Sequence, residues 1–99
     1  MIYVVATTQV KPENRDAYLA GAKECIAETQ KEKGCIYYDS HVSVNDPNRF
    51  VVVERWATRE DLAAHARSPH MKTWRALSAP FKVSPTEIEI ISDGNVERM

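Results

Sequence analysis

The segment of residues 49–74 constrains the fold most, because its hydrophobic pattern changes from that of a strand to that of two short helices within one stretch. Alternating side chains over residues 50–56 predict a strand whose apolar face also carries Glu54. Thr58 is a typical helix N-cap, and Ser68, followed by proline, predicts the start of a second helix. Helices that return across a strand form a layer over it, so we expect the carboxylate to face a space beneath these helices.

The remaining pattern places this segment in a longer alternation of strands and helices. Gly34 is expected to end the first helix, and a turn of residues 45–48 joins the second and third strands as a hairpin. The order β-α-β-β-α-β predicts an α+β, ferredoxin-like fold, with one four-stranded antiparallel sheet and helices on one face. The expected strands cover residues 2–10, 35–44, 50–56 and 83–91, and the expected helices cover residues 12–33, 58–67 and 69–79.

Chain length sets the next expectation. A chain of 99 residues suffices for one domain, which we place over residues 1–99, with a polar tail from about residue 93 that frays or reaches a partner. A single sheet with helices on one face leaves its other face uncovered. We therefore expect a homodimer, in which the open sheet face meets a second copy of the chain.

The overall charge and the sparse cysteines and glycines exclude several classes of protein. A net charge of −1 gives no basic surplus for a phosphate backbone, so we expect no nucleic-acid partner. No apolar run approaches the roughly 18 residues of a membrane span, and the N-terminus has no signal-peptide pattern. Cys25 and Cys35 have no metal-ligand or disulfide-scaffold spacing, so the expected compartment is the reducing cytoplasm. Without a glycine-rich phosphate loop, no tightly held nucleotide or flavin is expected.

The candidate catalytic residues are Glu54, His65 and His70. A carboxylate on an otherwise apolar strand face has a raised pKa when aromatic groups bury it, as a general acid or base requires. His65 follows Leu62 by three positions and faces inward, and His70 lies in the first turn of the next helix. The alternative is structural: Glu54 forms an ion pair or hydrogen bond with His65 or a backbone N–H, and the histidines are hydrogen-bonded core residues.

Three aromatic residues are the candidate substrate-binding groups: Tyr38, Trp56 and Trp74. A phenol can donate a hydrogen bond into a cavity and an indole can form a wall, although core packing explains the same residues. Glu54 with the three histidines of the chain has no HxH or HExxH spacing, so no metal site is predicted.

These residues lie in motifs that resemble the antibiotic biosynthesis monooxygenase family of the dimeric α+β barrel superfamily, and within it the quinol monooxygenases. The resemblance spans nearly the whole chain, and its landmarks are E-K-G-C-I-Y-Y at 32–38, E-R-W at 54–56 and L-A-A-H-A-R-S-P-H-M-K at 62–72. It implies a homodimeric barrel and an enzyme that oxidises small quinols or phenols with O2 without flavin, haem or metal. In such an enzyme Glu54 or His65 is the base, Tyr38 or His70 is a hydrogen-bond donor, and Trp56 is a wall.

Other members of the superfamily leave the reaction open. Haem-degrading members resemble this fold but use an Asn, a Trp and a haem-ligating His where this chain has Thr7, His65 and Arg75, so haem degradation is disfavoured. An isomerase of small keto compounds has a similar E…H…P-H pattern and needs no oxidant. A dimer that only binds a small molecule is a third reading of the same residues.

Overall fold

The computed structural model describes residues 1–94 and 96–99 and has the expected order of strands and helices. The first helical region begins with a short 3₁₀ turn, η1, and a second such turn, η2, follows the last helix. The elements are β1 (Ile2–Gln9), η1 (Pro12–Asn14), α1 (Arg15–Thr29), β2 (Cys35–Val42), β3 (Arg49–Trp56), α2 (Arg59–Ala66), α3 (Pro69–Ser78), η2 (Ala79–Phe81) and β4 (Glu87–Ile91).

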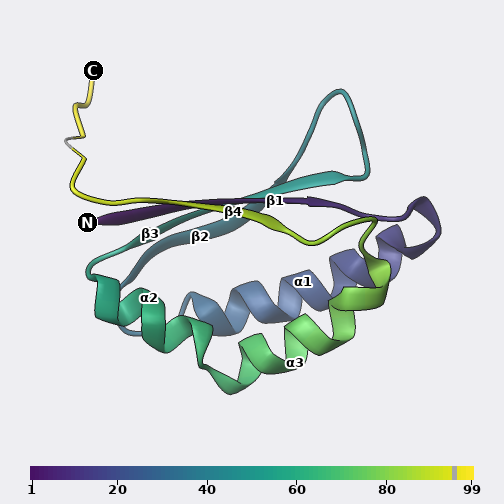
Figure 1. Ribbon diagram of the computed structural model, residues 1–99, viewed down its shortest axis with the longest axis horizontal. Coiled ribbons are helices and arrows are strands. Elements are labelled where there is room, and N and C mark those ends of the chain that lie inside the picture. Colours follow the sequence, from purple (N-terminus) through teal and green to yellow (C-terminus); the bar gives the residue numbers. More distant parts are fainter. Residues whose placement is uncertain (95) are drawn as a thin grey trace.

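The four strands form one antiparallel sheet in the order β2-β3-β1-β4. Figure 1 shows α1, α2 and α3 together on one side of this sheet. The ferredoxin-like α+β fold predicted from the sequence is thus confirmed. Among the described residues, no helix is long and apolar enough to cross a membrane.

Alternating burial along β1 identifies the face that meets the helices. Ile2, Val4, Ala6 and Thr8 are buried, whereas the intervening side chains are half-exposed on the other face. This is the two-residue period expected of a strand with one face against a core. On β3 the same face carries Phe50 and Trp56, which are almost fully buried, together with Glu54.

Helix α1 packs the stripe of side chains that its sequence predicted against this face. Tyr18, Ala22, Cys25 and Thr29 are buried, at the three- and four-residue spacing of one helix side. The Tyr18 ring contacts Phe50 on β3 and Trp74 on α3, with centroids 4.9 and 5.1 Å away. Apolar burial therefore holds the helix layer, α1 and α3, against the sheet.

The prediction that the first helix runs to residue 33 was wrong. Helix α1 ends at Thr29, and residues 30–33 form tight turns in which Lys31 and Glu32 donate backbone hydrogen bonds to residues three positions earlier. Gly34 then has a φ of 80°, and a Cβ there would overlap the Asp61 carboxylate. The contact with Asp61, at the start of α2, therefore requires a glycine at the position where the chain turns into β2.

Two strand predictions were also wrong. The second strand ends at Val42 and not at residue 44, and a bulge between Cys35 and Tyr37 interrupts its alternation, so that Ile36 is 47% exposed. The last strand begins at Glu87 and not at residue 83, because Pro85 has no N–H to donate to the ladder. A single bridge between Lys82 and Val10 precedes that gap.

Candidate functional site

A cavity of about 380 Å³ lies between the sheet and helices α2 and α3. Its sheet wall comes from all four strands, including Val4, Tyr38, Glu54 and Ile90. Three of these, Tyr38, Glu54 and Val4, stand side by side because they pair across β2, β3 and β1. The exposed edge strand β4 leaves the cavity accessible from that side, since Ile88 and Ile90 line it and are partly exposed.

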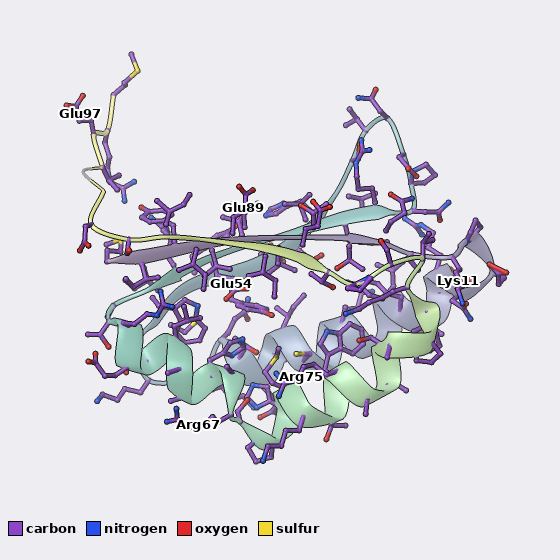
Figure 2. All side chains as sticks on the ribbon, viewed as in Figure 1. Lys11, Glu54, Arg67, Arg75, Glu89 and Glu97 are labelled. Atoms are coloured by element: carbon purple, nitrogen blue, oxygen red, sulfur yellow. The ribbon has the colours of Figure 1, made fainter. Side chains whose placement is uncertain are left out.

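Glu54 points from the sheet into this cavity, on the side facing the helices, whereas Glu89 lies on the opposite side (Figure 2). The residue is only 6% exposed, and its Oε1 accepts a hydrogen bond of 2.9 Å from the Trp56 indole. Burial raises the pKa of the Glu54 carboxyl, an effect that the Trp56 hydrogen bond and the nearby His65 oppose. Within the described chain no group donates to Oε2, so this oxygen is available to a ligand.

His65 lines the same cavity from α2 but is bonded to a different carboxylate. Its Nδ1 lies 2.6 Å from Oε2 of Glu32, and its ring packs 4.7 Å from the Trp56 ring. Because a carboxylate only accepts, Nδ1 carries the proton of this bond. Nε2 then presents a lone pair when the ring is neutral, and no described group is hydrogen-bonded to it. The expected alternative contact between Glu54 and His65 is not a hydrogen bond in this structure.

His70 does not line the cavity and lies behind His65. Its Nε2 is 2.9 Å from Glu32 Oε2 and within 3.3 Å of the Thr29 and Ser68 hydroxyls. Both hydroxyls donate their protons elsewhere, to the carbonyls of Cys25 and His65. The Nε2 proton of His70 therefore goes to Glu32, which receives two imidazole N–H groups on one oxygen.

The three aromatic candidates occupy different positions. Tyr38 and Trp74 line the cavity, as does Tyr18, which the sequence did not single out. Trp56 is fully buried behind the wall, where it holds Glu54 and stacks on His65. Burial, with the charge of Glu54, raises the pKa of the Tyr38 phenol far above its usual range, so the phenol is a neutral hydrogen-bond donor.

Sequence reasoning missed Glu32 and three basic residues that line the cavity: Arg59, Arg75 and Lys82. Glu32 fell in the last turn of the helix predicted over residues 12–33, so the turn after Thr29 was not foreseen. Its sequence signal was its place at the start of the landmark E-K-G-C-I-Y-Y, two residues before Gly34. The basic residues had no such signal, because they come from three separate segments.

Glu32, His65 and His70 also have the composition of a metal-binding group, with one ligand atom each within 4.8 Å of the others. Two histidines and a carboxylate suit zinc or iron(II). As they stand, the 2.6 and 2.9 Å separations are hydrogen-bond distances, shorter than the roughly 3.3 Å between ligands of tetrahedral zinc. The three side chains satisfy one another without an ion.

The arrangement can bind and move protons beside an apolar surface. Two acceptors, Glu54 Oε2 and His65 Nε2, and one donor, the Tyr38 hydroxyl, have no described hydrogen-bond partner and belong to residues of one cavity. Aromatic and aliphatic side chains make up most of the remaining wall. Such a site suits a small aromatic molecule with an ionisable hydroxyl.

Comparison with known proteins finds relatives that match most of this chain. The sequence model described as antibiotic biosynthesis monooxygenase matches residues 1–77. "Putative monooxygenase YcnE" of Bacillus subtilis is 32% identical over 93 residues, covering 89% of this chain and 98% of that protein. "Probable quinol monooxygenase YgiN" of Escherichia coli is 30% identical over 84 residues, covering 75% of this chain and 81% of that protein.

A solved structure agrees with the sequence matches. Rv0793 from Mycobacterium tuberculosis superposes with a TM-score of 0.91 at 27% identity, and the match covers 98% of each chain. The motifs at 32–38, 54–56 and 62–72 all fall inside the matched residues 1–77, and they supply Glu32, Tyr38, Glu54, His65 and His70.

Proposed function

Since the chain belongs to the antibiotic biosynthesis monooxygenase family, which supports an enzyme of the oxidoreductase type, we propose that it oxidises a small quinol or phenol with O2 and without a cofactor. The observation that carries this proposal is the pair of free acceptor atoms, Glu54 Oε2 and His65 Nε2, on one aromatic-walled cavity. Its volume of about 380 Å³ falls within the roughly 300–1,000 Å³ common for small-molecule sites.

The first step of the proposed reaction is removal of a phenolic proton. Glu54 Oε2 accepts this proton, and its raised pKa brings the carboxyl closer to neutral pH than an exposed glutamate. The apolar wall then surrounds an electron-rich phenolate, which transfers one electron to O2. The resulting superoxide and substrate radical combine, forming a carbon–oxygen bond, and the peroxide oxygen takes the proton back from Glu54.

The second step breaks the oxygen–oxygen bond. His65 Nε2 accepts the hydrogen on the carbon that bears the peroxide, the electrons of that bond form a carbonyl, and hydroxide leaves. The proton on His65 joins the hydroxide as water. The quinol loses four electrons in total, and O2 gains four, with one oxygen atom in the hydroxyquinone product and one in water.

Glu32 has a positioning role in this proposal. Its bond to Nδ1 fixes the His65 ring, so that Nε2 is the acceptor, and its bond to His70 ties α3 to the same point. The 2.6 Å separation also allows Glu32 to stabilise the imidazolium that forms when Nε2 takes a proton.

Oxygen consumption tests the reaction directly. With 1,4-naphthohydroquinone as substrate, we expect enzyme-dependent O2 uptake above the rate of the same solution without protein. Under ¹⁸O2, mass spectrometry should find one labelled oxygen atom in the hydroxynaphthoquinone. Glu54→Gln and His65→Ala should each reduce the rate sharply, and Glu24→Gln on the exposed side of α1 should not.

Other outcomes identify the competing functions. Conversion of a small keto compound without O2 uptake would assign the site to isomerisation. Binding of quinols with no product would assign it to ligand sensing. Full turnover in both variants would remove Glu54 and His65 from the mechanism.

We further infer that the protein is a homodimer through the open sheet face. Support comes from half-buried Val5 and Val53, which stand opposite each other at the centre of that face, and from Ile91 at its edge, which is 51% exposed. Light scattering during gel filtration should give twice the chain mass of 11.2 kDa. A monomer at micromolar concentration would contradict the inference.

A further inference from the structure

The cavity is basic although the chain as a whole is slightly acidic. Arg59, Arg75 and Lys82 line it, and Glu54 is the one carboxylate among its described lining residues. The net charge of the chain is −1. Arg59 and Arg75 are exposed, whereas Lys82 is partly buried. A quinol with no charged group gives the Lys82 ammonium nothing to bind, so its place in the cavity wall requires a separate explanation.

Lys82 is the best placed of the three. Its backbone pairs with Val10 in an isolated bridge. On either side of it, the Lys11 N–H donates to the Phe81 carbonyl and the Val83 N–H donates to the Gln9 carbonyl. The side chain is partly buried, and no described carboxylate forms an ion pair with it. Burial lowers the pKa of Lys82, which is the behaviour of an ammonium group that has lost water without gaining an anion.

Arg75 lines the cavity from α3 and is more exposed than Lys82, with its guanidinium beside the end of α2. One of its terminal nitrogens donates a 2.9 Å hydrogen bond to the Ala66 carbonyl at the end of α2, which fixes the guanidinium while leaving its charge without an acidic partner in the described chain. Arg67, by contrast, lies at the turn between α2 and α3 and does not line the cavity (Figure 2).

The polar groups of the cavity are separated along β1. Val4 stands next to Glu54, whereas Thr8 is hydrogen-bonded to Thr86 at 2.8 Å, on the side where β1 approaches Lys82. Four residues of extended strand separate these points, or about 13 Å. Between them the wall is apolar, with Ala6, Val52 and Ile88 in register. The cavity is therefore elongated, with an acid–base end and a cationic end.

We propose that the substrate carries an anionic group, a carboxylate, sulfonate or phosphate, that binds Lys82 while its ionisable hydroxyl lies at Glu54 and His65. An apolar aromatic body spans the middle of the cavity. The inference rests on the proposed function only in taking this cavity as the substrate site, and it narrows the substrate to acidic hydroxyarenes about as long as the cavity.

Paired ligands titrated without O2, so that no oxidation takes place, test the binding alone. Isothermal titration calorimetry should compare 6-hydroxy-2-naphthoate with its neutral primary amide, which has the same shape and the same hydroxyl. We expect wild-type protein to bind the naphthoate at least about tenfold more tightly, the effect of one charge-assisted contact. The preference should shrink at high salt, because screening weakens a partly exposed charge pair.

Substitutions then assign the preference to its residue. Lys82→Gln should abolish it, Arg75→Gln should retain most of it, and Lys82→Arg should retain it. Lys11→Gln and Arg67→Gln remove exposed cations that do not line the cavity and should leave the preference intact. Equal affinities for both ligands in wild-type protein, or a preference that survives Lys82→Gln, would overturn the proposal.

The two proposals fail in different ways. A preference for the naphthoate that depends on Lys82, with no O2 uptake on any quinol, would leave the anion site standing and contradict the oxidation. O2 uptake with neutral naphthohydroquinone, and no gain in kcat/KM on adding a carboxylate to the ring, would support the oxidation and contradict the anion site.

Discussion

Two glutamates flank His65, and the structure gives them different surroundings. Glu54 is buried on an apolar strand face, accepts one hydrogen bond from Trp56, and has a second oxygen that no described group contacts. Glu32 is in a turn, outside the cavity lining, and a single one of its oxygens accepts from both His65 and His70. Glu54 therefore has an oxygen that can accept a hydrogen bond from a ligand, whereas Glu32 accepts hydrogen bonds from protein groups.

This difference separates a group that can react from a group that positions. Desolvation disfavours the ionised form of Glu54 and raises its pKa, which is the direction that a general base at neutral pH needs. Glu32 instead fixes the orientation and proton position of His65. If distance to a histidine were the only criterion, Glu32 would be the better candidate for the base. Glu54 is the better candidate because it is buried and has an oxygen that accepts no hydrogen bond from the described residues.

The largest expected effect comes from Glu54→Gln. The amide keeps an oxygen to accept from Trp56 Nε1 but cannot take a proton, so kcat for the quinol should fall by about 100-fold or more. Steady-state O2 uptake measures this, with Glu24→Gln as the exposed control and circular dichroism to check folding. A kcat within twofold of wild type would assign the base elsewhere.

A smaller effect is expected from Glu32→Gln. The amide oxygen can still accept from an imidazole, but it no longer stabilises a charged ring, so kcat should fall about tenfold while KM stays nearly constant. KM is the discriminating quantity, because Glu32 does not line the cavity and a collapse of the site would change it. A loss equal to that of Glu54→Gln would erase the distinction between the two glutamates.

The smallest expected effect concerns stability. Because the folded-state pKa of Glu54 is raised, the folded protein binds its proton more tightly than the unfolded chain. The associated stability is fully present below the unfolded pKa and is lost as pH rises through the folded pKa. Each unit of pKa difference corresponds to about 1.4 kcal/mol.

Glu54→Gln removes that titration, so the variant should gain Tm relative to wild type at about pH 8 and show little gain at about pH 4. Differential scanning calorimetry at both pH values makes the comparison, with Glu24→Gln again as the control. A variant that is less stable than wild type at the higher pH would mean that ionised Glu54 is stabilised in the fold by more than Trp56 supplies.

Several features followed from the sequence because short-range rules govern them. The two-residue period of the third strand placed Glu54 on the core face with Phe50 and Trp56, and the i, i+3 relation to Leu62 placed His65 inward. Thr58 and Ser68 cap α2 and α3 as predicted. Each of these features depends on neighbours within one helical turn or one strand.

The partners of these residues depended on contacts between distant segments. Glu32 meets His65 and His70 only because α1 ends at Thr29 and Gly34 lies against Asp61, a steric condition set by α2. Lys82 reaches the cavity because β1 holds its backbone at Val10. The sequence by itself determined which residues face the core, since periodicity is local. Only the tertiary structure decided which carboxylate holds the histidine, because packing between elements sets where a helix stops and which side chains meet.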